Sequence, residues 1–118
     1  MTKAADRILL HLAEGQRRAI DPQEVYYLEI LKEDTRVRLR SARTLVDIRP
    51  AEKLLPLFEP HGFLRIHREY VVNLRRIRDI RRRANGREWE VKLEPPVNRV
   101  LPVSRGALAE LWKAFGAE

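Results

Sequence analysis

The chain has 118 residues, enough for one ordinary domain with a single modest core. Lys and Arg number 24 against 17 Asp and Glu, and the resulting net charge of +7 favours an anionic polymer or surface as partner. The absence of cysteine excludes disulfides, thiolate metal sites and a cysteine nucleophile. No apolar run approaches the roughly 20 residues of a membrane span. The segment Met1–Arg7 lacks an apolar signal core, so we expect a cytoplasmic protein with no membrane partner.

The first half of the chain has the pattern of short strands separated by polar turns. Runs of β-branched, aromatic and alternating apolar residues predict strands over residues 8–12, 17–20, 25–30, 36–40 and 44–48. Pro22–Glu24 is expected to form one helical turn, with Asp21 as its cap. Pro50–Phe58 predicts a short helix that Pro56 should end or kink.

The second half continues in the same way and ends in a helix. Strands are predicted over residues 63–68, 77–83, 88–93 and 99–103. Asn85-Gly86 is a strong hairpin signal, and Pro102 indicates an edge strand. Ser104 is expected to cap the last helix. About eight strands, two or three short helices and tight turns predict a mainly β (β-rich α+β) fold of packed antiparallel sheets.

One segment carries most of the information about function. Residues 63–77 read Phe-Leu-Arg-Ile-His-Arg-Glu-Tyr-Val-Val-Asn-Leu-Arg-Arg-Ile, and Val-Ser-Arg follows at 103–105. With the aromatic-x-Glu ending of Val25–Glu29, this pattern resembles the LytTR family, the DNA-binding domain of LytR/AlgR-type bacterial transcription regulators. The resemblance covers about residues 8–115, which implies one LytTR-like domain over residues 1–118 and no receiver domain.

Two departures from the family pattern stand out. Glu69 occupies a position where the family usually has Ser, and a carboxylate beside phosphates is unfavourable, so we expect Glu69 to face elsewhere. The loop over residues 30–35 is slightly long for the family.

The resemblance implies sequence-specific binding of double-stranded DNA through loops and strand ends, without a helix-turn-helix. It implies paired sites upstream of promoters, with two copies on DNA. The implied DNA-binding residues are Lys32, Thr35, Arg36, Arg65, His67, Arg68, Arg75 and Arg105. At the first hairpin tip either Thr35 or Arg36 aligns with the base-contacting position, and Arg105 aligns with a reader of a base edge.

The residues themselves support this interpretation. Eight arginines lie between residues 65 and 83, opposed only by Glu69 and Asp79. The guanidinium fork can grip phosphate or guanine with two parallel hydrogen bonds. The run Arg81–Arg83 is equally consistent with protection of an exposed sheet edge. His67 could be a packed, hydrogen-bonded histidine, and Tyr70 and Asn73 are expected to be structural.

Enzyme functions find no support in the residue inventory. The three histidines lack metal-ligand spacing, neither Ser41 nor Ser104 lies in a nucleophile-elbow motif, and no glycine-rich phosphate loop exists. We therefore expect no cofactor and no catalysis. Two alternatives stay open: an RNA-binding β surface, and a protein-interaction module with an acidic partner. The chain shows no obvious dimerisation element, so we expect a monomer in free solution.

Overall fold

Short antiparallel strands dominate the computed structural model, which describes residues 6–41 and 43–116. The strands are Ile8–His11 (β1), Arg17–Ile20 (β2), Val25–Ile30 (β3), Thr35–Leu39 (β4), Thr44–Asp47 (β5), Phe63–His67 (β6), Tyr70–Asn73 (β7), Ile77–Arg82 (β8), Trp89–Leu93 (β9) and Val100–Val103 (β10). The α-helices are Ala51–Phe58 (α1) and Leu108–Ala114 (α2). Single 3-10 turns cover Ala13–Gly15 (η1), Pro22–Glu24 (η2), Glu59–His61 (η3), Leu74–Arg76 (η4) and Arg105–Ala107 (η5).

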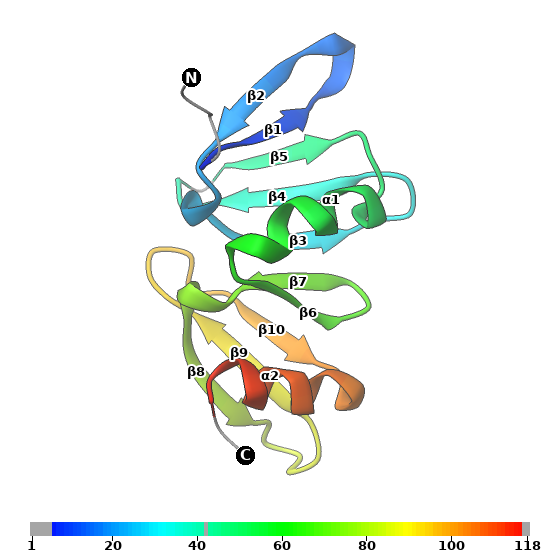
Figure 1. Cartoon of the computed structure of the whole chain (residues 1–118). Helices are drawn as coiled ribbons and strands as arrows, with labels where there is room; N and C mark the ends of the chain where they lie inside the picture. Colours follow the sequence, from blue (N-terminus) through cyan, green and yellow to red (C-terminus); the bar gives the residue numbers. More distant parts are fainter. Residues whose placement is uncertain (1–5, 42, 117–118) are drawn as a thin grey trace.

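The strands form three antiparallel sheets that stack along the molecule (Figure 1). A two-stranded hairpin, β1–β2, is followed by a five-stranded sheet in the order β5-β4-β3-β7-β6 and a three-stranded sheet in the order β10-β9-β8. This arrangement confirms the predicted mainly β fold of packed antiparallel sheets. No helix in the described residues is both long and apolar enough to cross a membrane.

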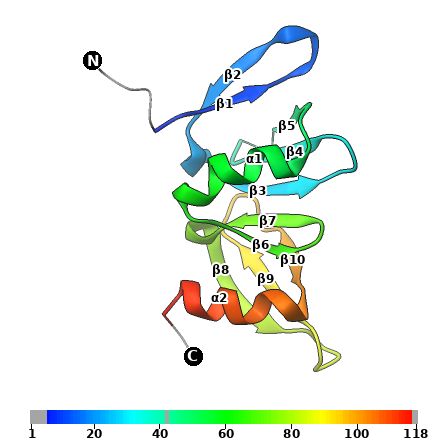
Figure 2. The ribbon, with the colours of Figure 1, turned by 45° about the vertical axis from the view of Figure 1, so that its right-hand side comes forward.

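Two hydrophobic clusters lie on opposite faces of the five-stranded sheet. The first packs sheet residues such as Leu28 and Val37 against Leu54 and Phe58 of α1 and against the β1–β2 hairpin. The second joins the β3-β7-β6 part of the sheet to the three-stranded sheet and to Leu111 of α2. Figure 2 shows the two helices lying over their respective sheets. The central sheet is therefore fixed from both sides, and its strand ends are held in place.

Several local predictions are confirmed and others are corrected. The Asp21 carboxylate accepts a hydrogen bond from the Gln23 N–H at 2.9 Å, as a cap should. Helix α1 continues two residues past Pro56 and ends at Phe58. Ser104 precedes η5, but its side chain makes no capping hydrogen bond. Pro102 does lie on an edge strand, β10.

Strand β7 is the element that the sequence pattern did not predict. All four of its residues are buried, so it has none of the alternation that marks a half-buried strand. It is an interior strand of the sheet, between β3 and the edge strand β6. Tyr70 and Asn73 are buried there, as the structural interpretation of these two residues expects. The Asn73 amide donates to the Val25 carbonyl at 3.0 Å.

Candidate nucleic-acid interface

Three loops meet at one side of the molecule, on the right in Figure 1. The Ile30 N–H at the end of β3 donates to the Glu69 carbonyl in the β6–β7 turn at 2.8 Å. The Ser104 N–H after β10 donates to the Ile66 carbonyl of β6 at 2.7 Å. These bonds tie the ends of β3, β6 and β10 together. We call residues 31–36, 67–69 and 104–106 the strand-end edge.

The β6–β7 turn is held in shape by its own side chains. The Arg65 guanidinium donates to the carbonyls of His67 at 3.3 Å and Arg68 at 2.7 Å. The His67 Nδ1 accepts a hydrogen bond from the Glu69 N–H at 3.1 Å, so the other ring nitrogen, Nε2, is the one that can donate. Arg65 thus braces the turn from within, and the turn presents the residue at its tip.

Arg68 is that residue, and its side chain is 85% exposed. Glu69 does not face elsewhere as the sequence pattern suggested, because its carboxylate lies 4.0 Å from Arg68 Nε. The backbone explains the placement: the Glu69 N–H and carbonyl are both used at the turn, which keeps this residue at the strand-end edge. An acid therefore stands beside the most exposed arginine of the turn.

A groove of about 1110 Å³ lies between the β6–β7 turn and the β8–β9 loop. It brings together His67 of the turn, the exposed Arg105 of η5 and Arg87 of the loop. Trp89 and Pro102 also line it. The groove is a positively charged recess next to the strand-end edge, a shape and charge suited to a nucleic-acid backbone.

The β3–β4 hairpin supplies Lys32 from its loop and Arg36 from the start of β4, and both are exposed. The Arg36 Nη1 lies 3.4 Å from the Glu29 carboxylate, an exposed ion pair that another anion can replace. Thr35 is fully buried, and its hydroxyl donates to the Arg49 carbonyl at 3.0 Å. Of the two candidates at this tip, only Arg36 presents its side chain to solvent.

Arg75 is not brought to the strand-end edge. It lies in η4, on the left in Figure 1, beyond the end of β7 that pairs with the start of β6. The hairpin therefore separates Arg75 from Arg68 by four strand residues, roughly 13 Å. Arg75 lies within the signature segment in sequence, and it is therefore grouped with the other DNA-binding candidates. Strand β7 runs away from the strand-end edge, so Arg75 lies at its far end.

The arginines of the β8–β9 hairpin are mostly paired with acids. Arg81 Nε lies 2.7 Å from the Glu90 carboxylate, and Arg83 contacts both Glu88 at 3.2 Å and Glu90 at 3.4 Å. The Arg82 guanidinium stacks over the Trp89 ring, 5.2 Å from its centroid. This side-chain ladder across the two strands matches the alternative in which these arginines protect a sheet edge.

Two groove residues were missed from the sequence. Arg87 lies in a loop that Asn85 shapes by accepting from the N–H groups of Arg87 and Glu88. Arg99 precedes β10, where its guanidinium donates to the Tyr27 and Tyr70 hydroxyls. Burial raises the pKa of the Tyr70 phenol, and Arg99 only partly opposes that rise, so this hydroxyl stays protonated.

Comparison with known proteins identifies the family to which the chain belongs. The family model of the LytTr DNA-binding domain matches residues 15–116, nearly the whole chain. The chain belongs to the LytTr DNA-binding domain family. A solved LytTr domain of a Bacillus cereus response regulator superposes with a TM-score of 0.74 at 21% identity, covering 94% of this chain and 97% of that one. No curated protein matches the chain.

Membership of this family gives the LytTr domain its function and partner. It is a DNA-binding domain of a transcription regulator, as the sequence signature implied. The signature residues at 63–77 correspond in the structure to β6, the β6–β7 turn, β7, η4 and the first residue of β8. Of these, only residues 67–69 of the turn lie at the strand-end edge.

Proposed function

We propose that this LytTr domain binds duplex DNA along the strand-end edge and reads sequence with side chains from three loops. Arg36, Arg68 and Arg105 extend toward base edges in this proposal, while Lys32 and His67 contact the backbone. The observation that carries it is the pair of backbone hydrogen bonds, Ile30 to Glu69 and Ser104 to Ile66, that unites the three loops. A preformed edge binds at a lower entropic cost than three independent loops.

Arg65 and the two remaining candidates take different roles. Arg65 positions the turn through its bonds to the carbonyls of residues 67 and 68, and contributes charge without reading bases. Thr35 is left out because it is buried, and Arg75 because it lies at the far end of β7. The proposed contact set is therefore smaller than the one that the sequence suggested.

Sequence specificity is proposed to require two copies on paired sites. A single small module buries only roughly 600–1,000 Å² on DNA, which is little for selecting one promoter among about 10⁶ competing positions. Two copies on adjacent half-sites raise discrimination through effective concentration. The protein is proposed to be a monomer in free solution, to act in the bacterial cytoplasm and to catalyse no reaction.

Selection of bound sequences from random duplexes tests this function, followed by affinity measurements against salt. We expect an enriched motif and a log–log salt slope of roughly −4 to −7, corresponding to about 4 to 8 phosphate contacts. Competition by unrelated duplex DNA separates this function from docking onto an acidic protein. No enriched motif together with a slope near zero would refute the proposal.

A further inference from the structure

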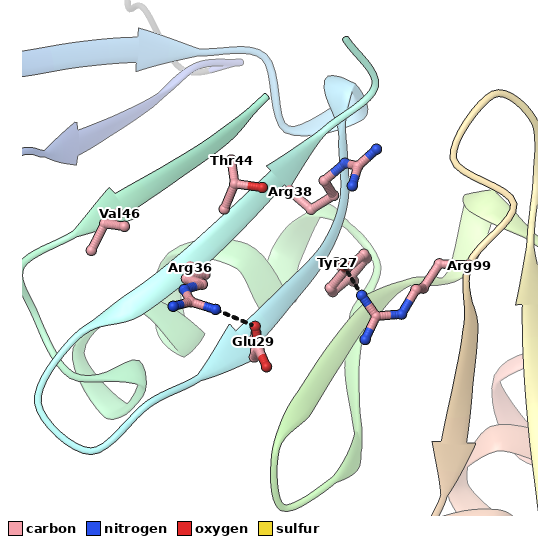
Figure 3. A pocket seen from close by; sticks show the side chains of 7 residues that line it. All are labelled: Tyr27, Glu29, Arg36, Arg38, Thr44, Val46 and Arg99. Atoms are coloured by element: carbon pink, nitrogen blue, oxygen red, sulfur yellow. Dashed lines mark hydrogen bonds and ion pairs between the residues drawn. The ribbon is translucent and has the colours of Figure 1, made fainter. Parts of the chain in front are cut away.

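The part of the five-stranded sheet that the three-stranded sheet leaves uncovered carries a second hollow, of about 370 Å³ (Figure 3). Its floor is a row of side chains on three neighbouring strands, since Tyr27 pairs with Arg38 and Arg38 pairs with Thr44. Arg99 reaches over it from the loop before β10. The hollow thus gathers residues from distant segments on one face of the sheet.

Arg99 is held there by two phenols. Its Nη1 donates to the Tyr27 hydroxyl at 3.0 Å and its Nη2 to the Tyr70 hydroxyl at 3.3 Å. The guanidinium carbon also lies 5.6 Å and 6.0 Å from the centroids of the two rings. No carboxylate in the described part of the chain lies within ion-pair distance of Arg99. A guanidinium has five N–H groups, so three remain for a ligand.

Arg38 is the second cation that lines the hollow and has no carboxylate within ion-pair distance among the residues described. Its Nε donates to the Leu39 carbonyl at 3.2 Å, and its two terminal nitrogens have no hydrogen-bond partner among the described residues. The acid of the hollow, Glu29, is paired instead with Arg36 at 3.4 Å. The lining of the hollow therefore carries a net positive charge, because Arg36, Arg38 and Arg99 outnumber Glu29.

The hydroxyls complete the set of donors. The Tyr27 oxygen accepts from Arg99, so its own O–H is free to donate, and Thr44 is exposed beside Arg38. Two guanidinium groups and two hydroxyl donors around a small recess match the acceptor oxygens of a tetrahedral oxyanion. We propose that this hollow binds a phosphate group, held by Arg99 and Arg38 with the hydroxyls of Tyr27 and Thr44.

Two sources can carry that group: a backbone phosphate of bound DNA, or a free phosphate-bearing solute. Tyr27 and Arg38 lie two residues behind Glu29 and Arg36 along their strands, roughly 7 Å further from the strand-end edge. A phosphate beyond the bases that are read could occupy this position. The DNA source rests on the proposed function, whereas the free solute does not.

The test is a titration of the whole chain with inorganic phosphate and pyrophosphate, followed by amide NMR, with chloride balancing the ionic strength. We expect saturable shifts at the amides of Arg38, Thr44 and Val100. Arg99→Gln and Arg38→Gln should each weaken binding about tenfold, the effect of losing a charged hydrogen bond. Arg40→Gln removes an equal charge from the turn after β4, outside the hollow, and should leave binding unchanged.

Arg99→Gln could weaken phosphate binding by disturbing the contact between the two sheets, since Arg99 binds Tyr27 and Tyr70. Arg38 makes no such contact, so Arg38→Gln tests the site without that effect. Shifts that never saturate, or titrations that are identical in wild type and Arg38→Gln, would overturn the site. The source is then assigned by the salt dependence of duplex binding. A slope reduced by about 1 in Arg99→Gln identifies a DNA phosphate, and an unchanged slope with intact phosphate binding identifies a free solute. If the protein did not bind duplex DNA, the proposed function would fail, but the phosphate titration would still test the phosphate site.

Discussion

Arg68 and Arg105 differ from the paired arginines of the β8–β9 hairpin in what surrounds them. Among the residues that the structure describes, Arg68 is 85% exposed and contacts an acid only at 4.0 Å, and Arg105 has no carboxylate partner. Arg81 sits 2.7 Å from Glu90. A guanidinium already bound to a carboxylate must give up that partner before it can bind DNA. Arg105 has no such partner to lose, and Arg68 has only the long contact with Glu69.

Alanine at either position should therefore reduce both affinity and selectivity. Arg68→Ala and Arg105→Ala are each expected to cost about 1–3 kcal/mol on the preferred duplex, the value of a bidentate base contact, and to flatten sequence preference. Arg75→Ala is the control, since it removes an exposed arginine away from the strand-end edge. Fluorescence anisotropy on selected and scrambled duplexes gives both quantities. Unchanged preference in Arg105→Ala would remove it from the base readers.

Glu69 should weaken DNA binding in the wild-type protein. Its carboxylate lies beside Arg68 on the edge and repels phosphate while competing for the arginine. Glu69→Gln is expected to tighten duplex binding by about twofold to fivefold, in the range of an exposed charge pair. Asp79→Asn, an exposed acid 3.9 Å from Arg78 in β8, serves as the comparison. Weaker binding by Glu69→Gln would show that the carboxylate supports the turn and does not oppose DNA.

The side-chain roles that could not be predicted from the sequence all depend on three-dimensional contacts or on strand orientation. Arg99 contacts tyrosines that are 72 and 29 residues away, so no local pattern marks it. Thr35 and Arg36 are adjacent and polar, and only the pleat of β4 decides that Thr35 is buried and Arg36 exposed. The positions of Arg68 and Arg105 at the strand-end edge were accessible to prediction, because Arg68 follows β6 directly and Arg105 lies two residues after β10, each within a recognisable motif.

At the scale of elements, a buried carboxylate joins the hairpin to the sheet. Asp47 at the end of β5 is fully buried and accepts from the His11 N–H at 2.9 Å, from the Arg49 N–H at 2.9 Å and from the Arg49 side chain at 2.8 Å. Burial by itself raises the pKa of Asp47, but the Arg49 side chain and the two N–H groups outweigh it and hold the pKa below 3.8. β1, β5 and the segment leading to α1 are linked through this one side chain.

The sign of the pH dependence follows from this lowered pKa. The folded state releases the Asp47 proton more readily than the unfolded chain, so its stabilisation is present above pH 4 and lost as pH falls through the folded pKa. Burial and the cations Arg49 and Arg17 also lower the pKa of His11 below 6.5. The unfolded chain therefore binds that proton first, and stability declines below pH 6.5 as well.

Asp47→Asn should measure how much the Asp47 carboxylate contributes to the free energy of unfolding. We expect it to lower the free energy of unfolding by about 1–3 kcal/mol at pH 7, because charged hydrogen bonds to Arg49 and His11 are weakened. The loss should shrink between pH 5 and pH 3, where the wild type loses the same interaction. Urea denaturation at several pH values measures this, with Asp79→Asn as the exposed control. A parallel pH profile in Asp47→Asn and wild type would contradict the role given to Asp47.

Element predictions succeeded where one face of a strand meets water. β4 alternates between buried and exposed residues and was predicted from that alternation, although it begins one residue earlier. β7 is buried on both faces and gave no such pattern. The Asn85-Gly86 hairpin formed, but its loop runs over residues 83–88 because β8 ends at Arg82 and β9 begins at Trp89. Side-chain pairing between the strands sets that length, and sequence alone does not show it.

The molecule as a whole is elongated, with extents of 47 × 32 × 26 Å. The three sheets stack along the long direction, and the strand-end edge runs beside the lower two of them in Figure 1. At 3.4 Å per base pair, 47 Å corresponds to roughly 14 base pairs. One copy with its long axis along the duplex thus extends over somewhat more than one helical turn.

This length constrains how two copies share one DNA site. Two copies in the same orientation, with long axes along the duplex, would overlap if their centres were one turn, about 34 Å, apart. We therefore expect half-site centres two turns apart, about 68 Å. Analytical ultracentrifugation should show a monomer without DNA and two copies on such a duplex. A stable dimer in free solution, or one copy on every selected duplex, would refute this arrangement.

The strand-end edge is proposed to be the DNA-binding surface. Amide NMR of the whole chain, with and without a selected duplex, tests it most directly. We expect the largest shifts at residues 31–36, 67–69 and 104–106, with η4 and α1 little changed. Large shifts over η4 and the outer face of β8, with the strand-end edge unaffected, would contradict it.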